Sequence, residues 1–334
     1  MRYSLAVLIA CLAGLPFVIG GDYYLALATQ VLLWSLVYTA WSIMGRFGLV
    51  SFGHGAFLGI GAYVTVILWN YVGLTPWIGI VAGMAVAIAV AVGIGYPGFR
   101  VRIVGNYFVL ITLALGEMVR LLIIALRGWT GGSLGLTPVR AATGQTFYAM
   151  QISSRPTFYF IALIAWIIGL AAWQIIDRSM IKLAMEAVDS DEDAAASIGV
   201  SIMRNKLIVT VVSAGLTALG GGLLGMYFMY INPGTLSGLN VSLQIVFAAV
   251  VGGMGILLGP SIGALFTIGL SEILRITVGN QIHGLDTTIF GILLIVFIIF
   301  LSKGIGGSIA ARFAERRKPA DHNRAGGVPA QQRV

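Results

Sequence analysis

The chain has 334 residues, of which 58% are hydrophobic and only 10% are charged. Because about 25% of the residues in a soluble globular domain are charged, this composition excludes an ordinary water-soluble protein. The single cysteine, Cys11, excludes a disulfide framework and a metal site built from cysteines, and no metal site is expected.

Apolar runs separated by loop signals predict an all-α polytopic membrane protein with about ten transmembrane helices, within a range of eight to ten. Some of these runs are short or interrupted by glycine. The alternative for the first run is a signal peptide, but no convincing cleavage site precedes Asp22, so an uncleaved span is favoured. The runs are residues 4–20, 23–44, 51–69, 76–96, 103–126, 157–176, 207–230, 241–258, 261–278 and 286–302.

The basic residues predict that both termini lie in the cytoplasm. If every run crosses the membrane, fifteen of the twenty Lys and Arg residues fall on the cytoplasmic side. This asymmetry is what the positive-inside rule describes. The net charge of +8 is therefore explained by topology, and no nucleic-acid partner is needed to account for it.

Residues 1–308 are expected to form one transmembrane domain with two prominent loops. Residues 127–156 form an external loop, and residues 177–206 form the longest polar loop on the cytoplasmic side. Residues 309–334 are basic and rich in Pro, Gly, Gln and Arg, without an apolar period. This composition predicts a disordered cytoplasmic tail.

Residues 51–61 are expected to be closely packed or locally unwound inside the membrane, because four glycines remove side chains and weaken the helix. An ionisable His54 within a span is by default a functional candidate. A path for a translocated solute would involve Ser51, Phe52, Gly53, His54 and Gly55. The favoured alternative is that His54 hydrogen-bonds a neighbouring helix, while the glycines only permit close contact.

Two pairs of opposite charges are spaced three residues apart within predicted spans: Glu117 with Arg120, and Glu272 with Arg275. This spacing lets each pair meet on one helix face, which lowers the cost of placing charge near lipid. Structural ion pairs near the outer helix ends are favoured. The alternative is a polar external vestibule for a zwitterionic substrate.

Two glycine-rich segments are predicted to lie between spans. The exposed amides of Gly131, Gly132 and Ser133 suit contact with a ligand or a docking protein, and an ordinary tight turn is an equally favoured alternative. The second segment predicts a tight hairpin between two spans. Its members are Gly252, Gly253, Gly255, Gly259 and Pro260.

The cytoplasmic loop is expected to contain short helices, because residues 182–198 are rich in alanine and poor in helix breakers. Ser190 and Asp193 have the spacing of a capping box, and Gly199 is a natural helix stop. An amphipathic helix here can insert into a groove on a soluble partner. A solvated acidic loop is the equally favoured alternative.

Four ordered motifs occur within about residues 30–305: Gly48–Phe57 (GLVSFGHGAF), Thr130–Leu136 (TGGSLGL), Glu186–Gly199 (EAVDSDEDAAASIG) and Val251–Pro260 (VGGMGILLGP). Together they resemble one family, the permease subunits of branched-chain (hydrophobic) amino acid ABC importers, and within it the M-type chains. Val188–Ser190 and Lys303–Gly307 depart from the family pattern, which bears on the substrate more than on the transporter class.

The resemblance implies a bacterial cytoplasmic (inner) membrane location, in the lipid bilayer, and a set of partners. These are a second homologous permease chain, two cytoplasmic ATPases and an external or periplasmic substrate-binding protein. It implies transport of branched-chain or other hydrophobic amino acids, with short amides, urea or small organic acids as related possibilities. The residues implied to couple to the ATPases are Glu186, Ala187, Asp191, Glu192, Asp193, Ala194, Ala195 and Gly199.

Absent motifs limit what the chain itself does. It has no phosphate-binding loop of the type GxxxxGK(S/T), no HExxH and no nucleophile elbow. We therefore expect a transporter subunit that is not an enzyme and holds no cofactor, with ATP hydrolysed by partner subunits. The alternative is a self-contained, ion-coupled secondary transporter of a small solute, for which Glu117 and Glu272 are the acidic candidates.

Overall fold

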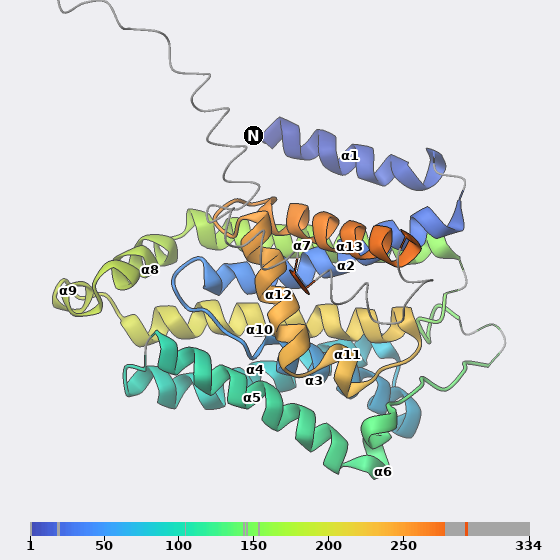
Figure 1. The fold of residues 1–334 in the computed structure, drawn as a ribbon, viewed down its shortest axis with the longest axis horizontal. Helices are drawn as coiled ribbons and strands as arrows, with labels where there is room; N and C mark the ends of the chain where they lie inside the picture. The colour runs from blue at the N-terminus through green and yellow to red at the C-terminus, as the bar shows by residue number, and fades with distance from the viewer. Residues whose placement is uncertain are drawn as a thin grey trace, which may run out of the picture.

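The structure, a computed structural model, describes residues 2–18, 21–103, 105–142, 144, 146–152, 154–277 and 291–292 (Figure 1). These residues form helices and contain no strand, only an isolated antiparallel bridge between Leu136 and Ile231. The helices are α1 (Arg2–Val18), α2 (Asp22–Gly45), α3 (His54–Ile67), the π-helical turn η1 (Leu68–Val72), α4 (Pro76–Arg100), α5 (Asn106–Ala125), α6 (Arg127–Thr130), the 3₁₀ turn η2 (Gly132–Leu134), α7 (Arg155–Arg178), α8 (Met180–Ser190), α9 (Glu192–Ser197), α10 (Ile202–Phe228), α11 (Pro233–Leu236), α12 (Leu239–Gly252) and α13 (Gly259–Thr277).

Seven helical segments of the described residues are long and apolar enough to cross a membrane. They agree with a multi-pass helical membrane protein, although the expected number was about ten. The seven are Asp22–Gly45, His54–Val72, Pro76–Arg100, Asn106–Ala125, Arg155–Arg178, Ile202–Phe228 and Pro233–Gly252.

The difference of three spans has identifiable reasons. The apolar part of α1, Leu5–Val18, is shorter than a full crossing requires. Helix α13 carries both Glu272 and Arg275 among its 19 residues, which reduces its apolar character. The tenth predicted run, 286–302, and the tail, 309–334, fall outside the described residues apart from 291–292. The cytoplasmic placement of both termini stays a prediction.

Consecutive long helices run in opposite directions, so the connecting segments gather at two opposite ends of the bundle (Figure 1). One end carries α8 and α9, and we call it the α8–α9 end. The other carries α6 and the chain that leads to the start of α7, and we call it the α6 end. The predicted cytoplasmic loop and the predicted external loop thus lie at opposite ends of the molecule.

Helix α2 forms the centre of the bundle and packs against α7, α10, α12 and α13. It is the least apolar of the seven candidate spans and also the most buried. Protein rather than lipid surrounds it, so it carries the buried polar side chains of Thr29, Ser35, Thr39 and Ser42. Helices α4 and α5 are only 33% buried and are strongly apolar, which suits an outer position.

Glycines bring α3 and α10 into backbone contact. A Cβ atom added at Gly61 would overlap the carbonyl oxygen of Ala218, and one added at Gly221 would overlap that of Leu58. The two helices therefore approach as closely as their backbones allow, as small residues permit in membrane helix pairs. This contact holds α3, which begins at His54, directly against α10.

The predicted hairpin between α12 and α13 is confirmed. Helix α12 ends at Gly252 and α13 begins at Gly259. A Cβ atom at Gly252 would overlap the Gly259 carbonyl oxygen, and one at Gly263 would overlap that of Ala248. Side chains at these glycines would force the two helices apart.

Candidate functional site

The predicted cytoplasmic loop folds into two short helices, α8 and α9, separated by Asp191 (Figure 1). The Oδ1 atom of Asp191 accepts hydrogen bonds from the backbone N–H groups of Asp193 and Ala194, at 3.0 and 2.9 Å. Asp191 is therefore the N-cap of α9, and the predicted capping box at Ser190 is wrong. Ser190 instead ends α8, where its hydroxyl donates to the Glu186 carbonyl. The predicted stop is confirmed, because Gly199 follows α9 with φ +87°.

A buried ion pair fastens α9 to α10. The Nζ atom of Lys206 lies 2.8 Å from Oε2 of Glu192, and their side chains are only 3% and 18% exposed. The buried Ala195 side chain lies on the same short helix. One of the acidic residues that suggested a solvated loop is thus part of the packed structure.

An exposed ion pair joins α9 to the connection between α4 and α5. Asp193 Oδ1 and Arg102 Nη1 are 2.6 Å apart, but their side chains are 83% and 59% exposed. Solvent weakens such a pair, so it contributes little to stability. The adjacent residues Glu192 and Asp193 therefore make contacts of very different strength.

Arg46 ties the end of α2 to the end of α7 and the start of α8. Its Nη1 atom lies 3.0 Å from Asp177 Oδ1, and its guanidinium lies 4.0 Å from the centre of the Trp173 ring. Lys182 also contacts Asp177, at 3.1 Å. Burial lowers the pKa of Arg46, while the Asp177 carboxylate opposes that shift. These contacts attach the loop to the ends of α2 and α7. A movement of the loop would therefore also move these two helix ends.

The outer surface of this loop is apolar as well as acidic. Met180, Leu183 and Ile198 are exposed large hydrophobic side chains, whereas Met185 and Val188 of α8 are buried against the bundle. Of the eight predicted coupling residues, Glu192 and Ala195 face the bundle. Glu186, Asp191, Asp193, Ala194 and Gly199 are exposed, and Ala187 is half-buried.

His54 lies fully buried at the start of α3 and bridges three parts of the bundle. Its Nε2 atom is 2.8 Å from the Ser213 hydroxyl on α10, and its Nδ1 atom is 3.1 Å from the Ser51 hydroxyl. Ser213 in turn donates to the Ala40 carbonyl of α2. The structure shows the hydrogen bond to a neighbouring helix that the favoured alternative predicts, while a role in solute passage stays a prediction.

The chain beside His54 is not helical over residues 51–53. The Phe52 N–H donates to the Thr112 hydroxyl on α5, at 3.1 Å. Gly53 and Gly55 have no room for a side chain, because a Cβ atom would meet the Thr112 and Gly238 carbonyl oxygens. The local unwinding and the close packing that the glycines predicted both occur in this segment.

The residues around Gly131 form a tight turn at the α6 end. Gly131 and Gly132 have φ values of +72° and +62°, which favour glycine. Gly132 N–H donates to the Thr130 hydroxyl, and the Ser133 carbonyl accepts from Asn232. The side chain of Ser133 is exposed. These contacts are those of the turn alternative, and contact with a ligand stays a prediction.

Glu117 contacts both Arg120 on its own helix and the start of α12. Its Oε2 atom lies 2.7 Å from Arg120 Nε, as the spacing predicted. Its Oε1 atom accepts the backbone N–H of Leu239, the first residue of α12, at 3.0 Å. This second contact comes from a residue 122 positions away, so the sequence did not reveal it. The pair lies in the second half of α5, which ends at Ala125.

The second predicted pair also forms. Arg275 contacts Glu272 through two nitrogens, at 2.5 and 3.1 Å, and the hydroxyl of Tyr23 also donates to Glu272. The Arg275 side chain is exposed. This pair therefore connects α13 with the start of α2.

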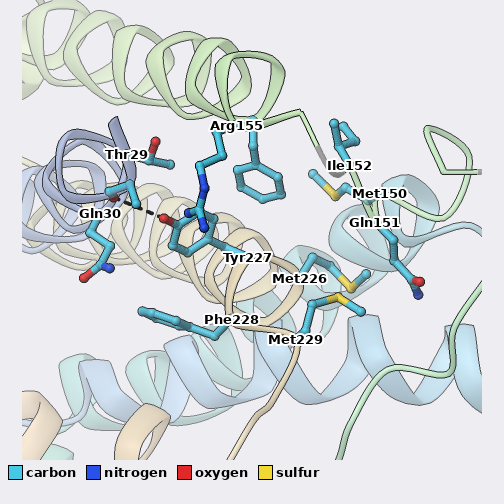
Figure 2. A pocket seen from close by; sticks show the side chains of 12 residues that line it. Thr29, Gln30, Met150, Gln151, Ile152, Arg155, Met226, Tyr227, Phe228 and Met229 are labelled. Atoms are coloured by element: carbon cyan, nitrogen blue, oxygen red, sulfur yellow. Dashed lines mark hydrogen bonds between the residues drawn. The ribbon is translucent and has the colours of Figure 1, made fainter. Parts of the chain in front are cut away.

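A cavity of about 500 Å³ opens between α2, α7 and α10 at the α6 end (Figure 2). The sequence did not predict this cavity, because its walls come from three separate parts of the chain. The only sequence signal was the polar pair Thr29 and Gln30 inside a predicted span. The lining residues are Ala26, Thr29, Gln30, Met150, Gln151, Ile152, Arg155, Phe158, Met226, Tyr227, Phe228 and Met229.

The family model for the permease component of the branched-chain amino acid transport system matches residues 23–301. The chain belongs to this permease family. That match covers the seven described spans, apart from Asp22 at the start of the first, and the loop that carries α8 and α9. The family resemblance that the four sequence motifs carried is therefore confirmed.

The permease is similar to several high-affinity branched-chain amino acid transport system permease proteins. It is 26% identical to LivM of Escherichia coli K12 over 79% of this chain and 65% of LivM, which agrees with the M-type resemblance. It is 26% identical to LivH of Salmonella typhimurium over 77% of this chain and 85% of LivH. It is 27% identical to BraD of Pseudomonas aeruginosa over 79% of this chain and 88% of BraD. No solved structure matches the permease.

The contact between Glu117 and α12 leads to a testable prediction. Glu117→Ala removes both the cap on Leu239 and the partner of Arg120, so we expect α12 to lose about 1–2 kcal/mol of stabilisation. Glu117→Gln keeps an acceptor for Leu239 and should have a smaller effect. Thermal unfolding of the purified permease in detergent measures both effects. Glu272→Ala is the control, and an equal loss in Glu272→Ala and Glu117→Ala would contradict the capping role.

Proposed function

We propose that this chain is a membrane-spanning permease subunit of an ATP-driven ABC importer in the bacterial cytoplasmic (inner) membrane. It translocates branched-chain or related hydrophobic amino acids that an external binding protein delivers. It works with a second homologous permease chain and two cytoplasmic ATPases. The chain itself holds no cofactor, and the ATPases hydrolyse the ATP.

The attachment of α8 and α9 to the bundle is the observation that carries this proposal. Arg46 and Asp177 join the loop to the ends of α2 and α7, and Glu192 with Lys206 joins it to α10. The exposed side chains of Met180, Leu183 and Ile198 offer an apolar surface to a docked ATPase. Movement of the ATPases would then displace several helix ends together and shift the bundle between its two access states.

Reconstitution of the complete complex in proteoliposomes tests the proposal. We expect uptake of radiolabelled leucine only when the binding protein is outside and ATP reaches the ATPases. Urea, short amides and small organic acids are compared as substrates in the same assay. Uptake by this chain alone, driven by an ion gradient, would instead establish the secondary transporter.

A substitution on the exposed face of α8 separates docking from folding. Leu183→Glu places a charge in the proposed apolar contact, so we expect at least a tenfold loss of ATPase binding with an unchanged thermal unfolding midpoint. Asp189→Asn is the control on the same helix, because it changes an exposed polar residue outside the predicted coupling set. ATPase binding is measured by co-purification and by titration of the labelled subunit. Wild-type ATPase binding by Leu183→Glu would show that α8 is not part of the docking surface.

A further inference from the structure

The cavity between α2, α7 and α10 has a polar side and an apolar side. Figure 2 shows the Arg155 guanidinium beside the Tyr227 ring, with Thr29 and Gln30 to one side and three methionines to the other. Met150 and Met226 are buried, and Phe158 is also buried in the wall. A ligand that fits this cavity has a polar end and a short apolar end.

The polar side carries the positive charge of Arg155, and the mostly exposed carboxylate of Asp22 lies next to it, outside the cavity lining. Arg155 Nε lies 3.8 Å from Asp22 Oδ2, which is a weak contact, and its side chain is 49% exposed. The two terminal nitrogens of Arg155 have no partner among the described residues. A guanidinium offers paired donors to a carboxylate. Asp22 beside it favours an ammonium group and disfavours a phosphate, which would bring more negative charge to the same place.

The apolar side suits side chains of varied shape. Thioether side chains are flexible and polarisable, so a wall of methionines adapts to different aliphatic groups. The volume of about 500 Å³ lies in the usual range for small-molecule sites. The cavity is thus large enough for one small amphipathic solute.

Backbone strain is concentrated in the same wall. Three non-glycine residues of the described chain have positive φ values, and two of them, Met150 and Met229, line this cavity. A left-handed conformation is unfavourable for a residue that carries a β-carbon. Strain of this kind gathers at ligand-binding sites, where the surrounding structure maintains it.

We propose that this cavity is a binding site for a zwitterionic hydrophobic amino acid at the α6 end of the permease. This inference rests on the proposed function and adds a site on this chain where substrate binds. Arg155 binds the α-carboxylate, Asp22 attracts the ammonium group, and the aliphatic side chain lies against Met150, Met226 and Met229.

The test uses the full complex of this chain with its partner permease and ATPases, in lipid nanodiscs without the binding protein. Equilibrium binding of L-leucine is compared with that of leucinamide, which lacks the carboxylate. We expect leucine to bind at least tenfold more tightly than leucinamide. Arg155→Gln should weaken leucine binding at least tenfold and leave leucinamide binding unchanged, because only the carboxylate contact is lost.

Arg140→Gln is the matched control, because Arg140 is an exposed arginine in the same external segment that does not line the cavity. It should keep the wild-type affinity for both ligands. Unchanged leucine binding in Arg155→Gln would overturn the site. An equal loss for leucine and leucinamide would also overturn it, and so would a phospholipid headgroup in the cavity of a complex that binds no leucine.

The uptake assay with the binding protein distinguishes failure of the proposed cavity site from failure of the proposed importer function. Normal ATP-dependent leucine uptake combined with unaltered binding by Arg155→Gln would reject the cavity and leave the importer intact. Absence of ATP-dependent uptake of any amino acid would reject the proposed function itself.

Discussion

Glu192→Ala should sharply lower both the thermal stability of the permease and its ATP-coupled uptake. Glu192 Oε2 lies 2.8 Å from Lys206 Nζ, and the lysine side chain is 3% exposed. Alanine would leave a buried ammonium group without its carboxylate partner, which costs about 3–5 kcal/mol. It would also free α9 from α10, so the proposed movement of the ATPases would no longer reach that helix. Thermal unfolding in detergent and uptake by the complete complex measure the two effects.

Two further variants separate the buried charge from the coupling contact. Asp193→Ala removes an exposed ion pair one residue away, so it should change the free energy of unfolding by less than about 1 kcal/mol. The double variant Glu192→Ala with Lys206→Met removes the unpaired charge and should recover much of the lost stability. We expect it to remain defective in coupled uptake. An equal loss of thermal stability in Glu192→Ala and Asp193→Ala would contradict the stabilising role of the buried pair.

The close packing of α3 and α10 leads to the second large effect. Gly61→Ala and Gly221→Ala should each destabilise the permease by about 1–3 kcal/mol or more, because overpacked cores must shift. The atoms in the way are the backbone carbonyl oxygens of Ala218 and Leu58, which cannot rotate away as a side chain would. Thermal unfolding and the monodisperse fraction on size-exclusion chromatography measure the change.

Gly93→Ala is the matched control for these substitutions. Gly93 lies on the exposed face of α4, where a Cβ atom would meet nothing within 4 Å. Alanine also favours a helix over glycine by about 1 kcal/mol, so this variant should be neutral or slightly stabilised. Wild-type stability in Gly61→Ala and Gly221→Ala would show that α3 and α10 tolerate a wider separation.

The sequence predicted local features well. The i, i+3 spacing predicted the Glu117–Arg120 and Glu272–Arg275 pairs, and both form. The glycines of residues 252–259 predicted the hairpin that joins α12 to α13. The cap of α9 was misplaced by one residue, because Ser190 and Asp191 are both good N-caps. Only the extended backbone of Asp191 decides between them.

Contacts between distant residues could not be predicted in this way. The acidic residues of the loop looked like one group, yet Glu192 pairs with the buried Lys206 and Asp193 with the exposed Arg102. The cap that Glu117 gives to Leu239 spans 122 residues. The cavity draws Gln30, Arg155 and Tyr227 from three helices.

The sequence by itself determined that this protein is a bundle of membrane-spanning helices with its acidic loop between two of them. In a bilayer each apolar segment must satisfy its own backbone hydrogen bonds, so composition and run length are enough to predict helices. Only the tertiary structure decided which charges are buried, which helix ends they join and where a cavity remains. Those features depend on how the helices are rotated and packed against one another, which no single segment encodes.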